Sequence, residues 1–301
     1  MDIFKQQRPI PALAIVFISL IVCLLFQTPV LMLFGSDLSV LDYWDLISMQ
    51  VIGTLIVFGG AICLSVKPMC GKSRFLFGNR PTRPLLLLIA VLALFVSQQL
   101  VAWASYVNAL VLERLGLQSW LGADQMSIQM ISKIIDFSSP VRTVTTVLVV
   151  GILPAVLEEA YFRGLVQRGM SRVVGYRSSI LPILLTSVLF SLVHGEMSAF
   201  LPRLVLGIVL GVIYARSHNL IACIVAHAFN NLLVVVFLAF SDQTYEMIQS
   251  QPVQNPGPIG PIISLGITFI LLVFIRLTST HNSIEQLYMR IKKSIEEKID
   301  E

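Results

Sequence analysis

Six side chains capable of acid–base chemistry or hydrogen bonding to a reacting group lie in apolar segments of the second half of the chain. They fall in three motifs: Glu158-Glu159-x-x-x-Arg163, Phe190-x-x-x-His194 and His227-x-x-x-Asn231. A charged or strongly polar group at membrane depth is costly unless it has a partner, so such residues indicate a functional site. Two acids, a guanidinium, two imidazoles and an amide are groups suited to hydrolysis rather than to helix packing.

The two neighbouring acids are expected to play different roles. Glu159 and Arg163 are four residues apart, on one helix face and in the order that favours an ion pair. Glu158 lies about 100° around the helix and has no such local partner. We therefore expect Glu158 to be the reactive acid, beside a kink caused by Pro154. The alternative is that both acids are structural groups satisfied by buried partners.

Each histidine shares a helix face with its motif partner, Phe190 with His194 and His227 with Asn231. One imidazole near Glu158 would help to hold and activate a water molecule. An imidazole and an amide together would donate hydrogen bonds to the oxygen of a tetrahedral intermediate. A lone histidine in a helical bundle is more often a packing residue, but two with motif partners indicate a shared cavity with the acid.

The composition indicates an integral membrane protein. Of the 301 residues, 56% are hydrophobic and only 13% are charged, whereas soluble domains carry about 25% charged residues. The net charge of +4 does not indicate nucleic-acid binding, because the basic residues lie between apolar runs. The four cysteines include no C-x-x-C pair, so no disulfide framework or zinc finger is expected.

Eight apolar segments are candidates for membrane spans, each of which requires about 20 residues. They are residues 10–34, 46–66, 84–112, 143–163, 179–194, 202–216, 220–240 and 259–276. The fifth and sixth are short. Backbone groups in lipid must find partners within the chain, and no segment alternates as barrel strands do. The expected fold class is all-α, a polytopic membrane helical bundle with about eight transmembrane helices.

Basic residues predict the orientation of the bundle. The loop 67–83 holds five basic residues and no acid, whereas the loop 35–45 holds three aspartates and no base. Lysine and arginine remain on the cytoplasmic side, so loop 67–83 and both termini are expected in the cytoplasm, with the protein in a bacterial plasma membrane. Residues 284–295 carry apolar residues at helical spacing, which predicts a C-terminal amphipathic cytoplasmic helix.

Simple span boundaries separate the motif residues in depth. Glu158 lies near the cytoplasmic end of its span, whereas His194 ends a span at the opposite side. The two meet only if the fifth span stops within the membrane, or if the fourth helix continues past Arg163 and sits deeper. Gly207 and Gly211 begin a stripe of small residues spaced by four, which lets the sixth helix approach a neighbour closely.

The ordered set of three motifs resembles the signature of the CPBP family of intramembrane proteases. The best-known members are the type II CAAX prenyl endopeptidases, and bacteriocin-processing and Abi-like proteins are grouped with them. The resemblance covers about residues 141–240; the first three spans match only in being spans. It implies a protease that depends on glutamate and not on a metal ion.

The resemblance also implies roles for individual residues. Glu158 and His194 would activate the attacking water, and His227 and Asn231 would form the oxyanion site. The supporting residues would be Glu159, Arg163 and Phe190.

We expect three regions: membrane spans 1–3 with their loops in residues 1–140, a catalytic core in 141–240, and the last span with the amphipathic tail in 241–301. The expected function is an intramembrane endopeptidase acting on a membrane-associated protein or peptide. Its partners would be that substrate and the lipid bilayer, without nucleic acid. Two alternatives are a non-catalytic membrane scaffold or chaperone, and a proton-coupled transporter.

No cofactor or metal ion is expected, although zinc is an open alternative. Glu158, His194 and His227 would supply three ligands and leave the fourth position to water. An H-E-x-x-H motif is absent, and a glutamate-activated water needs no metal ion.

Overall fold

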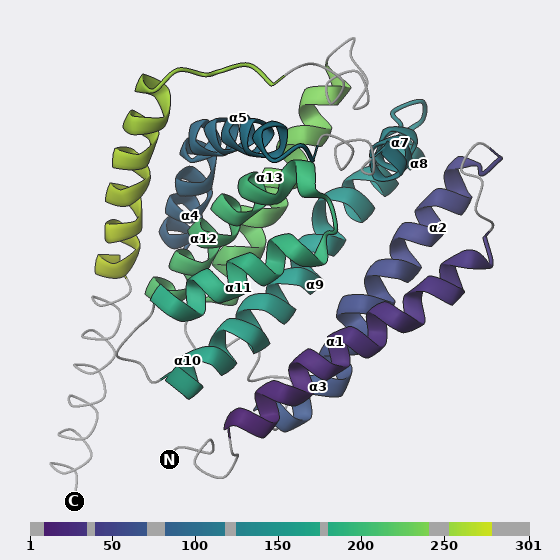
Figure 1. The fold of residues 1–301 in the computed structure, drawn as a ribbon, viewed down its shortest axis with the longest axis horizontal. Coiled ribbons are helices and arrows are strands. Elements are labelled where there is room, and N and C mark those ends of the chain that lie inside the picture. The colour runs from purple at the N-terminus through teal and green to yellow at the C-terminus, as the bar shows by residue number, and fades with distance from the viewer. Residues whose placement is uncertain are drawn as a thin grey trace, which may run out of the picture.

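The computed structural model describes residues 9–34, 40–70, 82–117, 125–174, 180–240 and 253–278. These residues form helices joined by short connections, with no strand among them, so the predicted all-α membrane bundle is confirmed (Figure 1). The first half contains α1 (Pro9–Met32), α2 (Tyr43–Thr54), η2 (Leu55–Gly60), α3 (Ala61–Cys70), α4 (Pro84–Val96), α5 (Gln98–Arg114) and α7 (Gln125–Ile134). The second half contains α8 (Pro140–Thr146), η4 (Val147–Ile152), α9 (Leu153–Tyr161), η5 (Phe162–Gln167), α10 (Arg168–Val174), α11 (Ile180–Val193), η6 (Met197–Ala199), α12 (Phe200–Ser217) and α13 (Leu220–Ala239).

Seven helices in the described residues are long and apolar enough to cross a membrane. They are Ile10–Met32, Tyr43–Pro68, Pro84–Arg114, Pro140–Val174, Met197–Ser217, Leu220–Phe237 and Ile259–Thr278. The fifth predicted span is the shorter helix α11, with 14 residues. The predicted amphipathic tail, residues 284–295, lies outside the described residues, as does most of loop 67–83.

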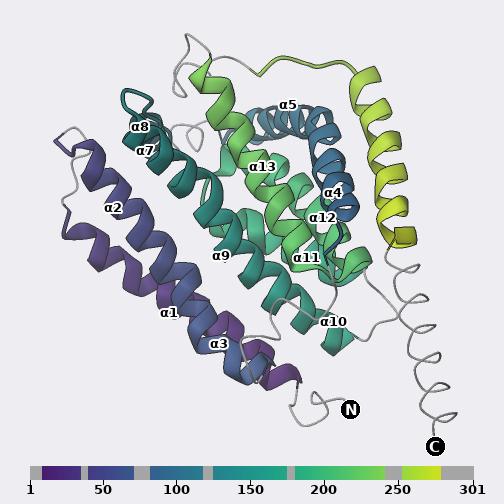
Figure 2. The same ribbon diagram turned by 180° about the vertical axis from the view of Figure 1, so that it is seen from behind.

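The third predicted span consists of two helices that meet at Ser97. From Pro84 to Arg114 the two helices and Ser97 comprise 31 residues, more than the roughly 20 that a span needs, and α5 runs in a different direction from α4 (Figures 1 and 2). Two hydroxyl groups donate hydrogen bonds to backbone carbonyls at the break. Ser97 Oγ donates to Leu94 O at 2.7 Å, and Ser264 Oγ donates to Val96 O at 2.6 Å. The redirected α5 packs on α12 and η6.

The fourth span, Pro140–Val174, is a continuous helix of 35 residues that contains two π-helical segments. Ser139 caps its start by accepting a hydrogen bond from the Arg142 amide, and Pro140 occupies the first turn. The π-helical segments η4 and η5 lie on either side of α9, which carries Glu158 and Glu159. Pro154 has no N–H to continue an α-helical ladder, which accounts for the irregular winding of η4 just before it.

Helices α1, η2 and α3 support the fourth span from one side. The Tyr161 hydroxyl donates to the Val16 carbonyl of α1 at 2.9 Å. The ring of Phe162 packs against Phe58 of η2 and Phe190 of α11, with centroids 5.7 and 5.1 Å apart. These aromatic contacts join the first spans to the helices that carry the three motifs.

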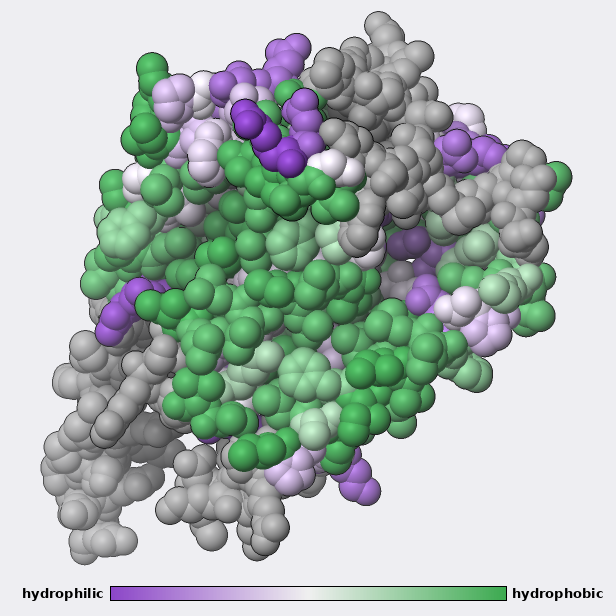
Figure 3. All heavy atoms as spheres, viewed as in Figure 1, coloured by the Kyte–Doolittle hydropathy of each residue, from purple (hydrophilic) through white to green (hydrophobic). Residues whose placement is uncertain are grey.

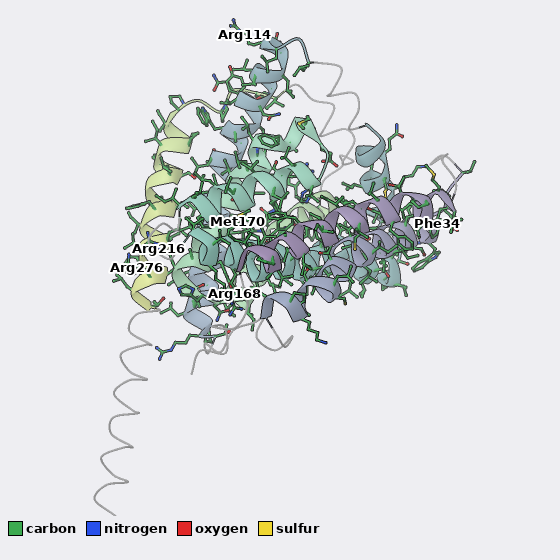
Figure 4. All side chains as sticks on the ribbon, turned by 60° about the horizontal axis from the view of Figure 1, so that its bottom comes forward. Phe34, Arg114, Arg168, Met170, Arg216 and Arg276 are labelled. Atoms are coloured by element: carbon green, nitrogen blue, oxygen red, sulfur yellow. The ribbon has the colours of Figure 1, made fainter. Side chains whose placement is uncertain are left out.

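The outer surface is apolar where the helices are exposed. Figure 3 shows hydrophobic side chains across the middle of the molecule, with most hydrophilic ones toward its ends. Arg168, Arg216 and Arg276 gather at one end of the bundle, and Arg114 lies at the opposite end (Figure 4). This basic end is the one that the lysine and arginine bias predicts to be cytoplasmic.

Candidate active site

The structure brings Glu158, His194 and His227 together from three helices. The Oε2 atom of Glu158 lies 3.7 Å from Nε2 of His194 and 4.0 Å from Nε2 of His227. The Glu158 residue is 6% exposed, and His227 is similarly buried. These separations exceed a direct hydrogen bond and match the reach of a bridging water. Both imidazoles therefore present the same ring atom to one carboxylate oxygen.

The lengths of two helices bring Glu158 and His194 to the same level. The fourth helix continues past Arg163 to Val174, so Glu158 lies about 24 Å from that end at 1.5 Å per residue. Helix α11 has 14 residues and ends just before His194, which places the histidine about 21 Å from the start of the helix. The two residues consequently lie at similar heights in the bundle.

Glu159 contacts both its predicted partner and an unexpected one. Its Oε1 atom lies 3.1 Å from Nη1 of Arg163, so the predicted ion pair is present, and both side chains are completely buried. The same oxygen accepts a hydrogen bond from Nδ1 of His227 at 2.9 Å. Arg163 is held in turn by a 3.0 Å hydrogen bond from Nη2 to the Gly207 carbonyl. Glu159 therefore also orients His227.

His194 is oriented by the backbone of α11, the helix that ends just before it. Its Nδ1 atom lies 2.6 Å from the Phe190 carbonyl oxygen. A carbonyl can only accept, so Nδ1 carries the hydrogen and Nε2 is the atom that faces Glu158. The ring of Phe190 packs on His194 and His227, with centroids 4.8 and 5.9 Å away, and the Arg163 guanidinium lies over it at 5.1 Å. Phe190 thus supports both imidazoles.

Asn231 lies one turn beyond His227, at the contact between α13 and η4. Its Nδ2 atom donates to the Gly151 carbonyl at 3.4 Å. The two helices approach closely here, because a Cβ at position 151 would lie 2.5 Å from a methyl carbon of Leu232 and would displace that side chain. The hydrogen bond uses one of the two amide hydrogens of Asn231.

The connection after His194 is fixed by a residue that the motifs did not indicate. Asn108 of α5 is buried; its Nδ2 atom donates to the carbonyls of Met197 and Ser198 at 2.9 and 3.0 Å, and its Oδ1 atom accepts from the Leu201 amide at 3.2 Å. Gly195 begins this connection with a φ of 73°, a conformation that favours glycine. The feature of the sequence that could have indicated this role is the side-chain amide of Asn108 inside the apolar segment 84–112.

An ion pair between Glu196 and Arg203 also lies in this region and was not predicted. Arg203 interacts electrostatically with Glu158. Both charges lie in or beside the apolar segment that begins at residue 202. Because charge at membrane depth is costly, the same rule would have identified both residues as candidates for the site.

The described residues contain no group of three or more His, Cys, Asp or Glu side chains arranged to hold a metal ion. The contacts above instead assign Nδ1 of each histidine to an acceptor of the protein, Glu159 or the Phe190 carbonyl. Both Nε2 atoms remain directed toward Glu158. The arrangement can hold a small polar molecule, such as water, between a carboxylate and two imidazoles.

Residues 140–233 match the family model described as type II CAAX prenyl endopeptidase, Rce1-like. The match begins at the first residue of α8 and ends in α13, so it includes all three motifs. No curated protein and no solved structure shows a significant match to the chain. This match, which runs from α8 into α13, confirms the resemblance of the motif-bearing region to the CAAX-type membrane proteases.

Proposed function

We propose that the protein is an intramembrane endopeptidase that hydrolyses a peptide bond of a membrane-associated protein or peptide with a water activated by Glu158. The observation that supports this most strongly is the placement of one Glu158 oxygen within 4.0 Å of Nε2 of both histidines. The family of the matched region supports a hydrolase. Glu158 and His227 are buried and His194 is half-buried, which supports a site with restricted access to bulk water.

In the first step, Glu158 and His194 hold the water. The Glu158 carboxylate accepts one proton of the water, while Nε2 of His194 accepts a hydrogen bond from the other. The oxygen then attacks the carbonyl carbon of the scissile bond. The hydrogen bond from His194 Nδ1 to the Phe190 carbonyl supports this role, because it leaves Nε2 of the neutral ring as an acceptor.

The oxygen of the resulting tetrahedral intermediate carries the negative charge. His227 and Asn231 would donate hydrogen bonds to it, as an oxyanion site requires. With Nδ1 of His227 donating to Glu159, Nε2 donates only when the ring carries both protons. Asn231 would use the amide hydrogen that does not contact Gly151.

In the last step, the carbon–nitrogen bond breaks and the intermediate collapses to a carboxylic acid and an amine. The proton that Glu158 took from the water passes to the leaving nitrogen, which returns Glu158 to its carboxylate form. One water is consumed, and no group of the protein is changed at the end of the cycle.

A peptide library tests this proposal. The purified protein in lipid nanodiscs is incubated with hydrophobic peptides, and mass spectrometry identifies the fragments. We expect cleavage by the wild type and by Glu113→Gln, a matched change at an exposed acid of α5, but none by Glu158→Gln. Equal cleavage by Glu158→Gln, or an intact library with the wild type, would contradict the proposal.

A further inference from the structure

The alignment between the fourth span and α12 places one more cationic side chain, that of Arg203, at the level of the site. Arg163 Nη2 donates to the Gly207 carbonyl, and Gln167 Nε2 donates to the Gly211 carbonyl. Both pairs are separated by 44 residues, so the helices run in parallel with a constant register. One turn closer to the connection after His194, the same register places Arg203 level with Glu159.

Arg203 lies one turn before the stripe of small residues that begins at Gly207 on α12. Gly207 packs directly on Ser187 of α11, because a Cβ at Gly207 would lie 3.0 Å from the Ser187 Cβ. Gly211 is equally close to Ile183. Arg203 follows the same spacing of four and carries a long side chain where the two glycines carry none. The register places Arg203 level with Glu159, the neighbour of the reactive acid, and Arg203 interacts electrostatically with Glu158.

The guanidinium of Arg203 is only partly satisfied by the protein. Nη2 pairs with Glu196, but Nη1 is buried and makes no hydrogen bond to any residue that the structure describes. The side chains of Arg203 and Glu196 are 20% and 16% exposed, so the ion pair is less enclosed than the fully buried pair of Glu159 and Arg163. An anionic acceptor at Nη1 would satisfy a buried donor that is otherwise destabilising.

We propose that Arg203, held by Glu196, binds a carboxylate group of the substrate; this inference rests on the proposed peptidase function. A planar guanidinium can pair with two carboxylates along different edges. Glu196 occupies one edge and leaves Nη1 for the substrate. The burial of Nη1 does not oppose this, because Glu158 and His227 are equally enclosed and must also meet the substrate. The positive charge also offsets the repulsion between a substrate carboxylate and the two acids of α9.

The test uses one hydrophobic peptide in three forms. The first has a free C-terminal carboxylate, the second has a C-terminal amide, and the third has the amide together with one glutamate placed in turn at each position near the C-terminus. Binding to the wild type in nanodiscs is measured by fluorescence anisotropy, and cleavage is measured in parallel. We expect a preference of about 10- to 100-fold for a form with a carboxylate over the plain amide. The first and third forms distinguish a terminal carboxylate from a side-chain carboxylate.

Two variants separate substrate binding from a structural ion pair. We expect Arg203→Gln to bring the ratio of carboxylate to amide binding close to one. We expect Glu196→Gln to keep that ratio at or above the wild-type value, because it removes a competing carboxylate and retains the guanidinium. Glu113→Gln serves as the matched exposed control and should keep the ratio.

The outcomes of this experiment are distinct. A carboxylate preference that Arg203→Gln removes supports the inference, whether or not the peptide is cleaved. Cleavage without any preference overturns the inference and leaves the peptidase proposal standing. A preference in binding without cleavage of any form contradicts the peptidase proposal alone. Equal loss of the ratio in Arg203→Gln and Glu196→Gln would show a structural ion pair and overturn the inference.

Discussion

The Oε1 atom of Glu159 lies 2.9 Å from Nδ1 of His227 and 3.1 Å from Nη1 of Arg163. One carboxylate oxygen thus joins the helix of Glu158 to α13 and pairs a buried cation at the same time. Neighbouring residues of a helix point about 100° apart, so this role for Glu159 leaves the adjacent Glu158 directed at Nε2 of both histidines. The helix geometry separates a positioning acid from a reactive one.

The first prediction concerns stability. Glu159→Gln removes the anionic partner of the fully buried Arg163 guanidinium, and Arg163→Ala removes the cationic partner of Glu159, which keeps its hydrogen bond to His227. Each change leaves a buried charge without its ion-pair partner, so we expect a loss of about 3–5 kcal/mol. Thermal unfolding in detergent measures this loss. Glu158→Gln is the matched control at the adjacent position and should melt nearly as the wild type does. If all three variants melted alike, the assignment of the two acids would be wrong.

Much of the site followed from one physical rule. Charged and amide groups inside apolar segments are costly in a membrane, and this rule singled out the motif residues that surround Glu158. The Glu159–Arg163 pair followed from spacing within one helix. The contact between Glu159 and His227 spans 68 residues, and no spacing within a helix predicts such a contact.

The remaining features depend on contacts between distant segments. The apolar run 84–112 reads as one span because its composition does not change at Ser97. The break between the two helices is stabilised by Ser264, which donates a hydrogen bond to the Val96 carbonyl 168 residues away in the sequence. Asn108 was a visible polar residue in that run, but its partners near residue 198 are about 90 positions away. Composition predicted the helices, and tertiary contacts determined where one of them turns.

The second prediction concerns Asn108, which holds the connection that follows His194. Asn108→Ala removes hydrogen bonds to two carbonyls and one amide, so we expect reduced stability and at least a several-fold lower rate of peptide cleavage. Buried groups that lose their partners cost about 1–3 kcal/mol each. The measurements are thermal unfolding and the initial rate on one cleaved peptide.

Ser105→Ala is the matched control on the same helix, because the Ser105 hydroxyl donates to the carbonyl of Val101 one turn earlier and not to the connection after His194 that the structure describes. We expect wild-type behaviour from this variant. A wild-type rate and melting temperature for Asn108→Ala would show that α5 does not support the His194 end of the site.

The third prediction concerns orientation in the membrane. From the lysine and arginine bias, loop 67–83 faces the cytoplasm and the loop before α2 faces outward. In a variant without native cysteines, Val40→Cys should react with a membrane-impermeant thiol reagent on intact cells, whereas Lys72→Cys should react only after lysis. Labelling of position 72 in intact cells would reverse the orientation.

The fourth prediction concerns the metal ion. If Glu158 itself takes the proton from water, cleavage should survive exhaustive chelation, and elemental analysis should find far less than one zinc ion per chain. A zinc-dependent site would lose activity on chelation and regain it on addition of Zn²⁺, because zinc supplies hydroxide by lowering the pKa of its bound water. Specific rescue by zinc would reassign Glu158, His194 and His227 as ligands.

The central claim is that Glu158 is the general base. The most direct test is the single-turnover rate of peptide cleavage by Glu158→Gln and by the wild type, at enzyme concentrations that saturate the peptide. The glutamine has nearly the same shape and cannot take the proton from water, so we predict a rate at least about 100-fold lower with an unchanged melting temperature. A single-turnover rate within a few-fold of the wild type would contradict the assignment of Glu158 as the base.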